Sequence, residues 1–267
     1  MLRNLNDEPN GTEDTDGGVT MRIDTIATVS EARADDFPGR TAIVIDVLRA
    51  TSNMATALAH GAAGIVAAET VQAARNLQQP GDLLGGERNC VRIAGFDLGN
   101  SPFEYAANDV RGRRIVMTTT NGTRALYKSL KAQHVLAGCL LNAGACADAA
   151  LALRKDIVLV CAGTQDAFAL EDGLGAGAII AALLERRDSR LPLAMNDCSL
   201  SMLHAFERKQ DRLHETLASG QTGVRLVKLG FAGDIAYCAR LDTFPVCPVL
   251  KGRTIVAGEP AAYTEAR

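Results

Sequence analysis

Three acidic residues stand where they could take part in chemistry. Asp46 ends the apolar run "IVID", Glu87 follows two glycines in "GGER", and Asp97 lies in "GFDLG". Mg²⁺ prefers oxygen ligands and is usually held by one or two carboxylates together with phosphate oxygens of a substrate. Arg49 and Arg88 accompany the acids, and a guanidinium group can bind phosphate through two donors at once. The pattern predicts an Mg²⁺ site for a phosphorylated substrate, with the three acids as metal ligands or acid–base groups.

Two segments rich in hydroxyl groups are candidates for binding the phosphate. In "TTTNGT", residues 118–123, an Asn-Gly pair allows a tight turn and the threonines supply donors. In "DVLRATS", Thr51 and Ser52 follow Arg49, at the expected start of a helix that would offer free N–H groups to an anion. Hydroxyls that only cap helices would give the same pattern. The substrate-binding candidates in the two segments are Arg49, Thr51, Ser52, Thr119, Thr120, Asn121, Gly122 and Thr123.

A further pair of acids, Glu171 and Asp172, follows the apolar run "DIVLVCAG" at the expected start of a helix. Acids in the first turn of a helix interact favourably with the helix dipole, by about 0.3–1 kcal/mol, and this alone could explain the pair. Ligands in open α/β sheets bind outside the carboxyl ends of the strands. Because the pair follows such a strand end, Glu171 and Asp172 are also candidate catalytic groups.

Composition narrows the class of protein. The 267 residues include no run of 18 apolar side chains, and the first residues lack a secretory-signal pattern, so we expect a cytoplasmic protein without a membrane partner. The net charge of -3 gives no general attraction to nucleic acid. Seven cysteines without a CxxC pair, and four dispersed histidines, indicate free thiols and no zinc site. The Ala-rich, apolar helix patterns are compatible with a homodimer.

Strand-type and helix-type patterns alternate along the chain, which predicts an α/β fold with a mostly parallel sheet flanked by helices. The strand-type runs lie at 42–46, 64–68, 114–118, 134–138 and 156–162. The helix-type stretches lie near 52–61, 69–78, 101–107, 122–131, 143–153, 172–187, 197–217, 222–230 and 233–241.

Composition divides the chain into two parts. Residues 1–20 are acidic and poor in apolar side chains, which favours a disordered tail, and residues 21–260 are expected to form one two-lobed domain. Residues 85–102 are expected to form a Gly-rich loop that ends in the capping box "SPFE". The late segment "FPVCPVLKGRTIVAG" predicts two short strands at a sheet edge, where proline is tolerated.

Taken together, these motifs resemble the 2-phosphosulfolactate phosphatase family. The resemblance covers about residues 22–258 and is carried by "VIDVLRATS", "GGER", "FDLGNSPFE", "TTTNGT", "CAG" with "ALEDGLGAG", and "RLVKLGFAGDIAYCARLDTFPVCPV". It implies hydrolysis of (R)-2-phospho-3-sulfolactate to 3-sulfolactate and phosphate, with Mg²⁺ as cofactor, in a route to coenzyme M. It also implies an α/β fold specific to the family.

Carried to matching positions, the resemblance implies the same three acids as metal or acid–base groups. It implies Arg49, Arg88, Asn100 and the 118–123 turn as the substrate-binding residues. One position departs from the family pattern: Thr222 stands where a Ser-x-His-Gly type of segment would place histidine. The departure bears on the identity of the substrate or on the rate.

Two other functions compete with this one. A haloacid-dehalogenase-type phosphatase would use Asp46 as a covalent nucleophile, but the position of its second aspartate falls on Leu48, which cannot transfer a proton. A catalytically silent anion-binding protein is the second alternative. A nucleotide-binding module lacks support, since neither a P-loop nor a strand-linked GxGxxG motif occurs.

Overall fold

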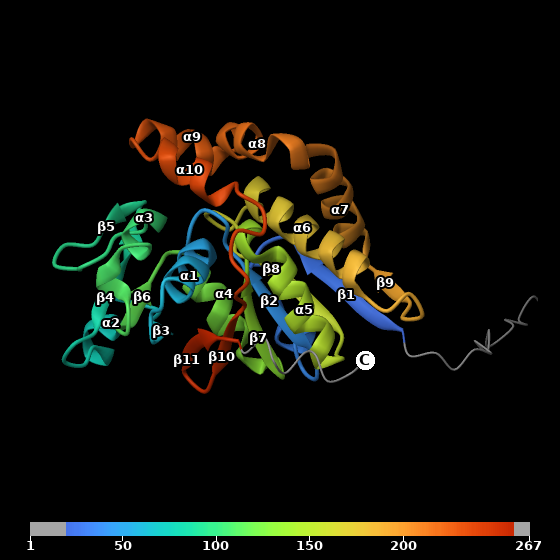
Figure 1. Cartoon of the computed structure of the whole chain (residues 1–267), viewed down its shortest axis with the longest axis horizontal. Helices are drawn as coiled ribbons and strands as arrows, with labels where there is room; N and C mark the ends of the chain where they lie inside the picture. The colour runs from blue at the N-terminus through green and yellow to red at the C-terminus, as the bar shows by residue number, and fades with distance from the viewer. Residues whose placement is uncertain (1–19, 259–267) are drawn as a thin grey trace, which may run out of the picture.

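The computed structural model describes residues 20–258, and nearly all of the predicted tail over residues 1–20 lies outside the described residues. Within these described residues, one eleven-stranded sheet crosses the fold, and helices flank it (Figure 1). The strand order is β5-β4-β6-β3-β11-β10-β7-β2-β8-β1-β9. The predicted α/β class, with a mostly parallel sheet flanked by helices, is confirmed.

The strands are β1 (Met21–Ile26), β2 (Thr41–Ile45), β3 (Gly64–Ala67), β4 (Leu83–Arg88), β5 (Val91–Arg92), β6 (Arg114–Thr118), β7 (His134–Gly138), β8 (Ile157–Cys161), β9 (Leu193–Met195), β10 (Pro248–Lys251) and β11 (Thr254–Ala257). The α-helices are α1 (Ala50–Ala59), α2 (Val71–Leu77), α3 (Pro102–Tyr105), α4 (Gly122–Lys128), α5 (Ala143–Leu153), α6 (Leu170–Arg186), α7 (Asp197–Lys209), α8 (Leu213–Ser219), α9 (Gln221–Lys228) and α10 (Ala232–Cys238).

The strands that lead to the site are buried on both faces. All five residues of β2 and all five of β8 are buried, which matches their uninterrupted apolar sequences. The two strands pair in parallel, and their last residues, Ile45 and Cys161, lie opposite each other in the register. Asp46 therefore emerges at the same edge of the sheet as the loop that follows β8.

Two parallel sectors make up the sheet, and the β10–β11 hairpin joins them. One sector contains β4, β6 and β3, and the other contains β7, β2, β8, β1 and β9. The hairpin pairs antiparallel with β7 on one side and β3 on the other. The prediction that these two strands lie at a sheet edge is therefore wrong. Pro248 is tolerated here because it is the first residue of β10.

Sheet twist explains how both sectors contribute to one site. The sheet order separates β2 from β6 by five strand-to-strand steps, and the antiparallel hairpin gives the two sectors opposite nominal directions. A twist of roughly 20–25° per step adds up to more than about 100° over this span. The accumulated rotation brings the carboxyl ends of β2 and β6 back toward one another.

Residues 85–102 do not all form the expected loop. Gly85, Gly86, Glu87 and Arg88 instead belong to β4, which pairs in parallel with β6. Gly86 has a φ of 142°, and a Cβ there would stand 1.9 Å from the carbonyl oxygen of Thr118. Only glycine allows the two backbones to approach so closely. The glycines of "GGER", which suggest a flexible loop, are therefore needed for the pairing of β4 with β6.

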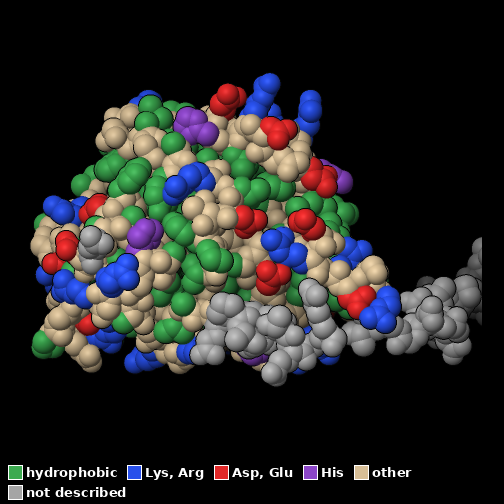
Figure 2. Space-filling model, viewed as in Figure 1, with side chains coloured by type: hydrophobic (Ala, Val, Ile, Leu, Met, Phe, Trp, Pro, Cys, Tyr) green, Lys and Arg blue, Asp and Glu red, His purple; other side chains and the backbone are tan. Residues whose placement is uncertain are grey.

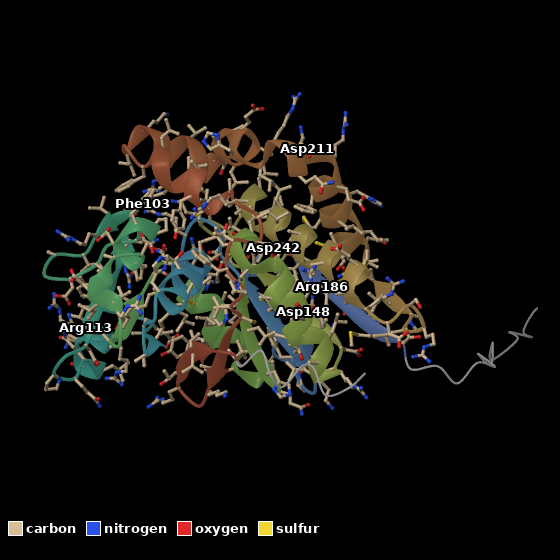
Figure 3. All side chains as sticks on the ribbon, in the orientation of Figure 1. Phe103, Arg113, Asp148, Arg186, Asp211 and Asp242 are labelled. Atoms are coloured by element: carbon tan, nitrogen blue, oxygen red, sulfur yellow. The ribbon has the colours of Figure 1, made fainter. Side chains whose placement is uncertain are left out.

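Helices α5, α6 and α7 pack together against the larger sector (Figure 1). A salt bridge of 3.3 Å between Arg186 Nε and Asp148 Oδ1 links α6 to α5, and Figure 3 shows the two side chains next to each other. The helix predicted over 197–217 is two helices, α7 and α8, separated by a short 3₁₀ turn at Gln210–Arg212. That break lets the C-terminal helices turn back over the site.

The surface is mixed in charge. On the face seen in Figure 2, acidic and basic side chains are interspersed among apolar ones. Within residues 20–258, no helix combines the length and the apolar character needed to cross a bilayer.

Candidate active site

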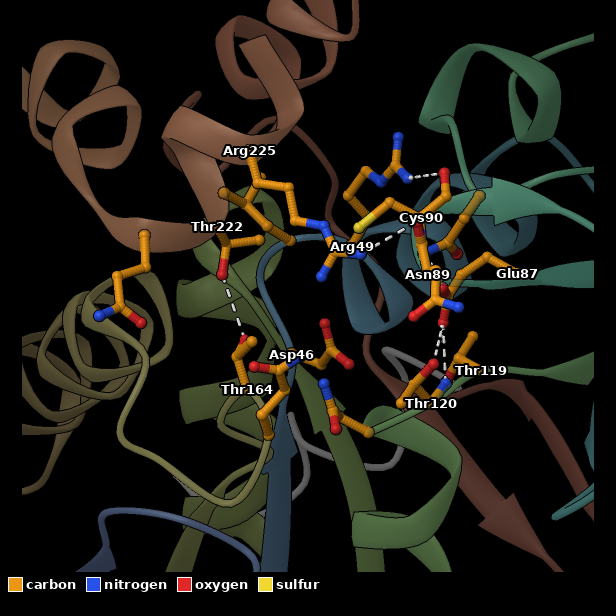
Figure 4. A pocket seen from close by; sticks show the side chains of 15 residues that line it. Asp46, Arg49, Glu87, Asn89, Cys90, Thr119, Thr120, Thr164, Thr222 and Arg225 are labelled. Atoms are coloured by element: carbon orange, nitrogen blue, oxygen red, sulfur yellow. Dashed lines mark hydrogen bonds between the residues drawn. The ribbon is translucent and has the colours of Figure 1, made fainter. Parts of the chain in front are cut away.

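A cleft lies where the carboxyl ends of β2, β6 and β8 meet the β4–β5 hairpin and α9 (Figure 4). Most of its lining residues carry a carboxylate, guanidinium, hydroxyl or side-chain amide group. The lining residues are Asp46, Leu48, Arg49, Glu87, Asn89, Cys90, Asn100, Thr119, Thr120, Asn121, Thr164, Gln165, Gln221, Thr222 and Arg225.

Asp46 is fixed at the end of β2 by the first turn of α1. Its Oδ1 accepts a hydrogen bond of 3.1 Å from the N–H of Ala50, and its own N–H donates to Thr51 Oγ1 at 3.0 Å. The Thr51 hydroxyl donates to the Asp46 carbonyl, and the Ser52 hydroxyl donates to that of Val47. Thr51 and Ser52, predicted to bind substrate, are buried groups that hold the loop in place, and neither lines the cleft.

The electrostatic surroundings of Asp46 favour a nearby cation. Burial raises the pKa of Asp46 to about 7, and the negative charges of Glu87 and Glu171 add to the increase. The N–H of Ala50 and the charge of Arg49 oppose it. A buried carboxylate with other acids close by is costly to ionise unless a positive charge compensates it.

Glu87 connects two elements of the smaller sector. Its Oε1 accepts hydrogen bonds of 2.8 Å from both the N–H and the hydroxyl of Thr120, and its Oε2 accepts one of 2.7 Å from the N–H of Cys90. Glu87 thereby holds the β4–β5 hairpin against the turn after β6, and its side chain lines the cleft. Figure 4 shows Glu87 and Thr120 on one side of the cleft, with Asp46 at its base.

The turn after β6 supplies hydroxyl and amide groups to the cleft. Thr119, Thr120 and Asn121 line it. Thr123, also predicted to bind substrate, is buried, and its N–H and hydroxyl bond to the side chain and carbonyl of Thr119. Gly122 allows close packing, because a Cβ there would stand 2.7 Å from Asp46 Oδ2. Thr123 and Gly122 thus shape the turn and do not face the cleft.

Asn100 enters the cleft with a defined orientation. Its Oδ1 accepts a hydrogen bond of 2.7 Å from the Nδ2 of Asn53, a buried residue of α1. The oxygen of the Asn100 amide is therefore engaged, and its Nδ2 is the group left to donate. Asn100 therefore lines the cleft, and its binding of the substrate stays a prediction.

The two predicted arginines differ from the expectation. Arg49 lines the cleft, but its guanidinium forms a buried ion pair with Asp234 and stacks over the ring of Phe231 at 4.7 Å. Arg88 lies outside the set of lining residues, and it donates to the carbonyl of Glu87 and to Thr118 Oγ1. Arg49 and Arg88 act here as structural connectors.

Asp97 does not join Asp46 and Glu87. Its carboxylate accepts a hydrogen bond of 2.8 Å from the N–H of Leu84, and it lies outside the cleft. In the described part of the chain, no group of three His, Cys, Asp or Glu side chains is arranged to hold a metal ion. The predicted three-carboxylate site is therefore not formed, and two of its members, Asp46 and Glu87, share the cleft.

Glu171 and Asp172 stand behind the cleft wall. Asp172 Oδ1 and Oδ2 each accept a hydrogen bond of 2.9 Å, from the N–H groups of Val47 and Gly163, so Asp172 joins the loops after β2 and β8. Burial first, and then the charges of Asp46 and Glu171, raise its pKa well above the ordinary value. Burial also raises the pKa of Glu171, against the effect of the nearby Thr222 hydroxyl. Neither acid lines the cleft.

Several lining residues were not anticipated from the sequence, among them Asn89, Cys90, Thr164, Gln221 and Arg225. Three of the cleft residues come from one face of α9, at positions 221, 222 and 225. That helical spacing was visible in "GQTGVR", but nothing in it indicated which other elements the helix would meet. Thr222 was singled out as a departure from the family pattern, and its hydroxyl lies 3.2 Å from that of Thr164.

The donor set fits a hard divalent cation bound by two carboxylates. Asp46 and Glu87 line one cleft together with hydroxyl and amide oxygens, which are the ligands that Mg²⁺ accepts. Asp46 Oδ1 is engaged by Ala50, whereas no donor among residues 20–258 bonds to Oδ2. A cation placed there would compensate the charges that raise the pKa of Asp46.

Comparison with known proteins gives a consistent assignment. The model of the 2-phosphosulpholactate phosphatase family matches residues 26–253. The chain is 41% identical over 227 residues to a protein of Symbiobacterium thermophilum, covering 84% of this chain and 96% of that protein. It is 38% identical over 235 residues to one of Caldanaerobacter subterraneus subsp. tengcongensis, covering 86% and 96%. Both proteins are named "Probable 2-phosphosulfolactate phosphatase". The chain thus belongs to the 2-phosphosulpholactate phosphatase family.

Proposed function

We propose that this protein is an Mg²⁺-dependent phosphatase that hydrolyses (R)-2-phospho-3-sulfolactate to 3-sulfolactate and phosphate. The observation that carries the proposal is the convergence of Asp46 and Glu87 on one cleft whose opposite surfaces bear hydroxyl, amide and guanidinium donors. Membership of the family and the names of the relatives support the choice of substrate. Supply of the product to coenzyme M synthesis, and a cytoplasmic location, stay predictions.

Two groups of cleft residues would have different functions: the acids would bind the metal ion, and the neutral donors would bind the phosphate. Asp46 and Glu87 would hold the Mg²⁺ ion, which when bound neutralises phosphate charge and acidifies a water molecule. Thr119, Asn121 and the Nδ2 of Asn100 would donate to phosphate oxygens. Donors fixed before the substrate arrives stabilise the developing charge without reorganising, and this is the main contribution of a protein to phosphoryl transfer.

Buried connections keep this arrangement rigid. Asp172 holds the backbone next to Asp46, and Glu87 holds Thr120. The Leu48 side chain lines the cleft at the position where a haloacid-dehalogenase-type enzyme needs an acid–base aspartate. A covalent aspartyl-phosphate at Asp46 is therefore not part of the proposal, and rapid-quench mass spectrometry of the protein during turnover should detect none.

A substrate screen tests the proposal. Phosphate release from 2-phosphosulfolactate, 2-phospholactate and a simple alkyl phosphate is measured with Mg²⁺ and with EDTA. We expect turnover of 2-phosphosulfolactate that EDTA abolishes and that added Mg²⁺ restores. Binding of 2-phosphosulfolactate without release of phosphate under any condition would instead identify a silent anion-binding protein.

A further inference from the structure

The cleft has one arginine whose charge is not already committed. Arg49 is paired with Asp234, and Arg88 is turned away from the cleft. Arg225 lines the cleft, is half-buried, and within residues 20–258 has no carboxylate at salt-bridge distance. Its one protein hydrogen bond there, from Nη2 to the carbonyl of Asn89, is a long 3.4 Å. A half-buried guanidinium with such weak partners is suited to bind an anion that enters from outside.

Neutral hydrogen-bonding groups surround this arginine. Gln221 and Thr222 lie on the same face of α9, and the Thr222 hydroxyl meets that of Thr164 from the loop after β8. Figure 4 shows Thr222 and Arg225 projecting from α9 on the side of the cleft away from Glu87. Glu171 lies beside Thr222, but it is buried and does not line the cleft.

The cleft therefore has two electrostatic sides. One side, with Asp46 and Glu87, attracts a cation, and the other, with Arg225, attracts an anion. A tetrahedral group with three oxygens can accept from donors in several directions, as Arg225, Gln221 and the threonine hydroxyls would offer. A planar carboxylate matches the fork of a single guanidinium and uses the remaining donors less well.

We infer that Arg225, with Gln221 and Thr222, forms the subsite for the sulfonate of the substrate, and that Arg225 determines specificity for a sulfonated phosphate ester. This inference rests on the proposed function, because it takes 2-phosphosulfolactate as the substrate. Arg225 would bind a part of the substrate that does not react. Its loss should therefore act on sulfonated substrates and leave related substrates without the sulfonate nearly unaffected.

Steady-state kinetics of Arg225→Met and Arg225→Lys test the inference, with 2-phosphosulfolactate and 2-phospholactate as paired substrates. Lys228→Met, an exposed position on the same helix, is the matched control. We expect Arg225→Met to lower kcat/KM for 2-phosphosulfolactate by roughly 10- to 150-fold, mainly through KM, as for loss of a charge-assisted hydrogen bond. The value for 2-phospholactate should change less than about threefold, and Arg225→Lys should lie between.

Calorimetric binding of 3-sulfolactate and of lactate gives a readout that does not depend on turnover. We expect Arg225→Met to weaken binding of 3-sulfolactate and to leave that of lactate unchanged. Equal losses for both substrates would overturn the inference and assign Arg225 to the phosphate or the carboxylate. Unchanged kinetics for both would remove Arg225 from the site. If the parent protein hydrolyses neither substrate, the proposed function fails, and the calorimetric comparison alone decides whether the sulfonate subsite exists.

Discussion

Arg49 and Asp234 form a buried ion pair that ties the end of β2 to α10, with side chains only 1% and 4% exposed. The second carboxylate oxygen of Asp234 accepts a hydrogen bond of 2.7 Å from the hydroxyl of Ser101. The capping box predicted at Ser101 is therefore not formed. The Ser101 side chain bonds to α10 and makes no cap hydrogen bond to its own helix. Three segments far apart in the sequence meet at this pair, next to the cleft.

This ion pair should be costly to break on one side only. We expect Asp234→Ala to lower the free energy of unfolding by about 3–5 kcal/mol, because Arg49 would be left buried without its partner. The double variant Arg49→Met with Asp234→Leu should lose clearly less, since it removes both charges. Urea denaturation measures both values, and a loss below about 1 kcal/mol for Asp234→Ala would show that the pair does not hold the two segments together.

The acidity of Asp46 should appear in the pH dependence of stability. Burial raises its pKa from the ordinary 3.8 to about 7 in the metal-free protein, so the native state holds this proton more tightly than the unfolded state. The resulting stabilisation is fully present below about pH 4 and is lost as the pH rises through about 7. In EDTA, Asp46→Asn should therefore exceed the parent in stability by on the order of a few kcal/mol at about pH 8.

The comparison of Asp46→Asn with the parent needs only thermal or urea unfolding at several pH values. The difference between the two proteins should shrink toward zero below about pH 3, where the parent carboxyl is protonated in both states. Added Mg²⁺ should stabilise the parent at about pH 8 and leave Asp46→Asn unchanged. Equal stability of the two proteins across the range would contradict the raised pKa.

Glu87 and Asp97 can be separated by metal binding. Glu87→Gln should weaken Mg²⁺ binding measured by calorimetry by about tenfold or more, because one of two carboxylates is lost. Asp97→Asn should bind Mg²⁺ like the parent, since that carboxylate caps the N–H of Leu84 outside the cleft. If Asp97→Asn had the larger effect, the assignment of the two acids would be reversed.

Gly122 tests the close packing beside Asp46. A Cβ at this position would stand 2.5 Å from the Cβ of Ala50 and 2.7 Å from Asp46 Oδ2. We expect Gly122→Ala to destabilise the protein by about 1–3 kcal/mol and to lower activity by displacing the carboxylate. Gly233→Ala is the control, because its Cβ would meet only the edge of the exposed Phe103 ring, at 3.4 Å. Activity equal to the parent in Gly122→Ala would show that the packing is not required.

Most helices and the longer apolar strands were predictable because hydrophobic patterns are local, whereas β1, β4, β5 and β9 were not predicted. The run before Asp46 is buried on both faces, as its composition indicates, and it delivers that acid to the carboxyl edge of the sheet. Alternation of side chains along an extended segment explains why Arg88 and Asp97 lie outside the cleft. Glu87 and Arg88 are neighbours on β4, so their side chains point to opposite faces, and only Glu87 reaches the cleft.

The sequence around Asp97 contains a pattern that predicts its position outside the cleft. It lies between Phe96 and Leu98, both buried, and this alternation places the Asp97 side chain on the opposite, exposed side. Arg225 is a different case, because its place in the cleft depends on how α9 packs across the carboxyl end of β2. No local pattern encodes a contact between segments nearly 180 residues apart, and the partner of Arg49 was hidden from the sequence for the same reason.

We propose above all that Asp46 and Glu87 together hold the divalent cation needed for phosphatase activity. The most direct test of this proposal is an Mg²⁺ titration of phosphate release from 2-phosphosulfolactate by the parent protein, Asp46→Asn and Glu87→Gln. We expect saturable activation of the parent, a loss of activity of at least about 100-fold for Asp46→Asn, and a higher Mg²⁺ requirement for Glu87→Gln. Phosphate release that is unaffected by EDTA, or full activity in Asp46→Asn, would contradict it.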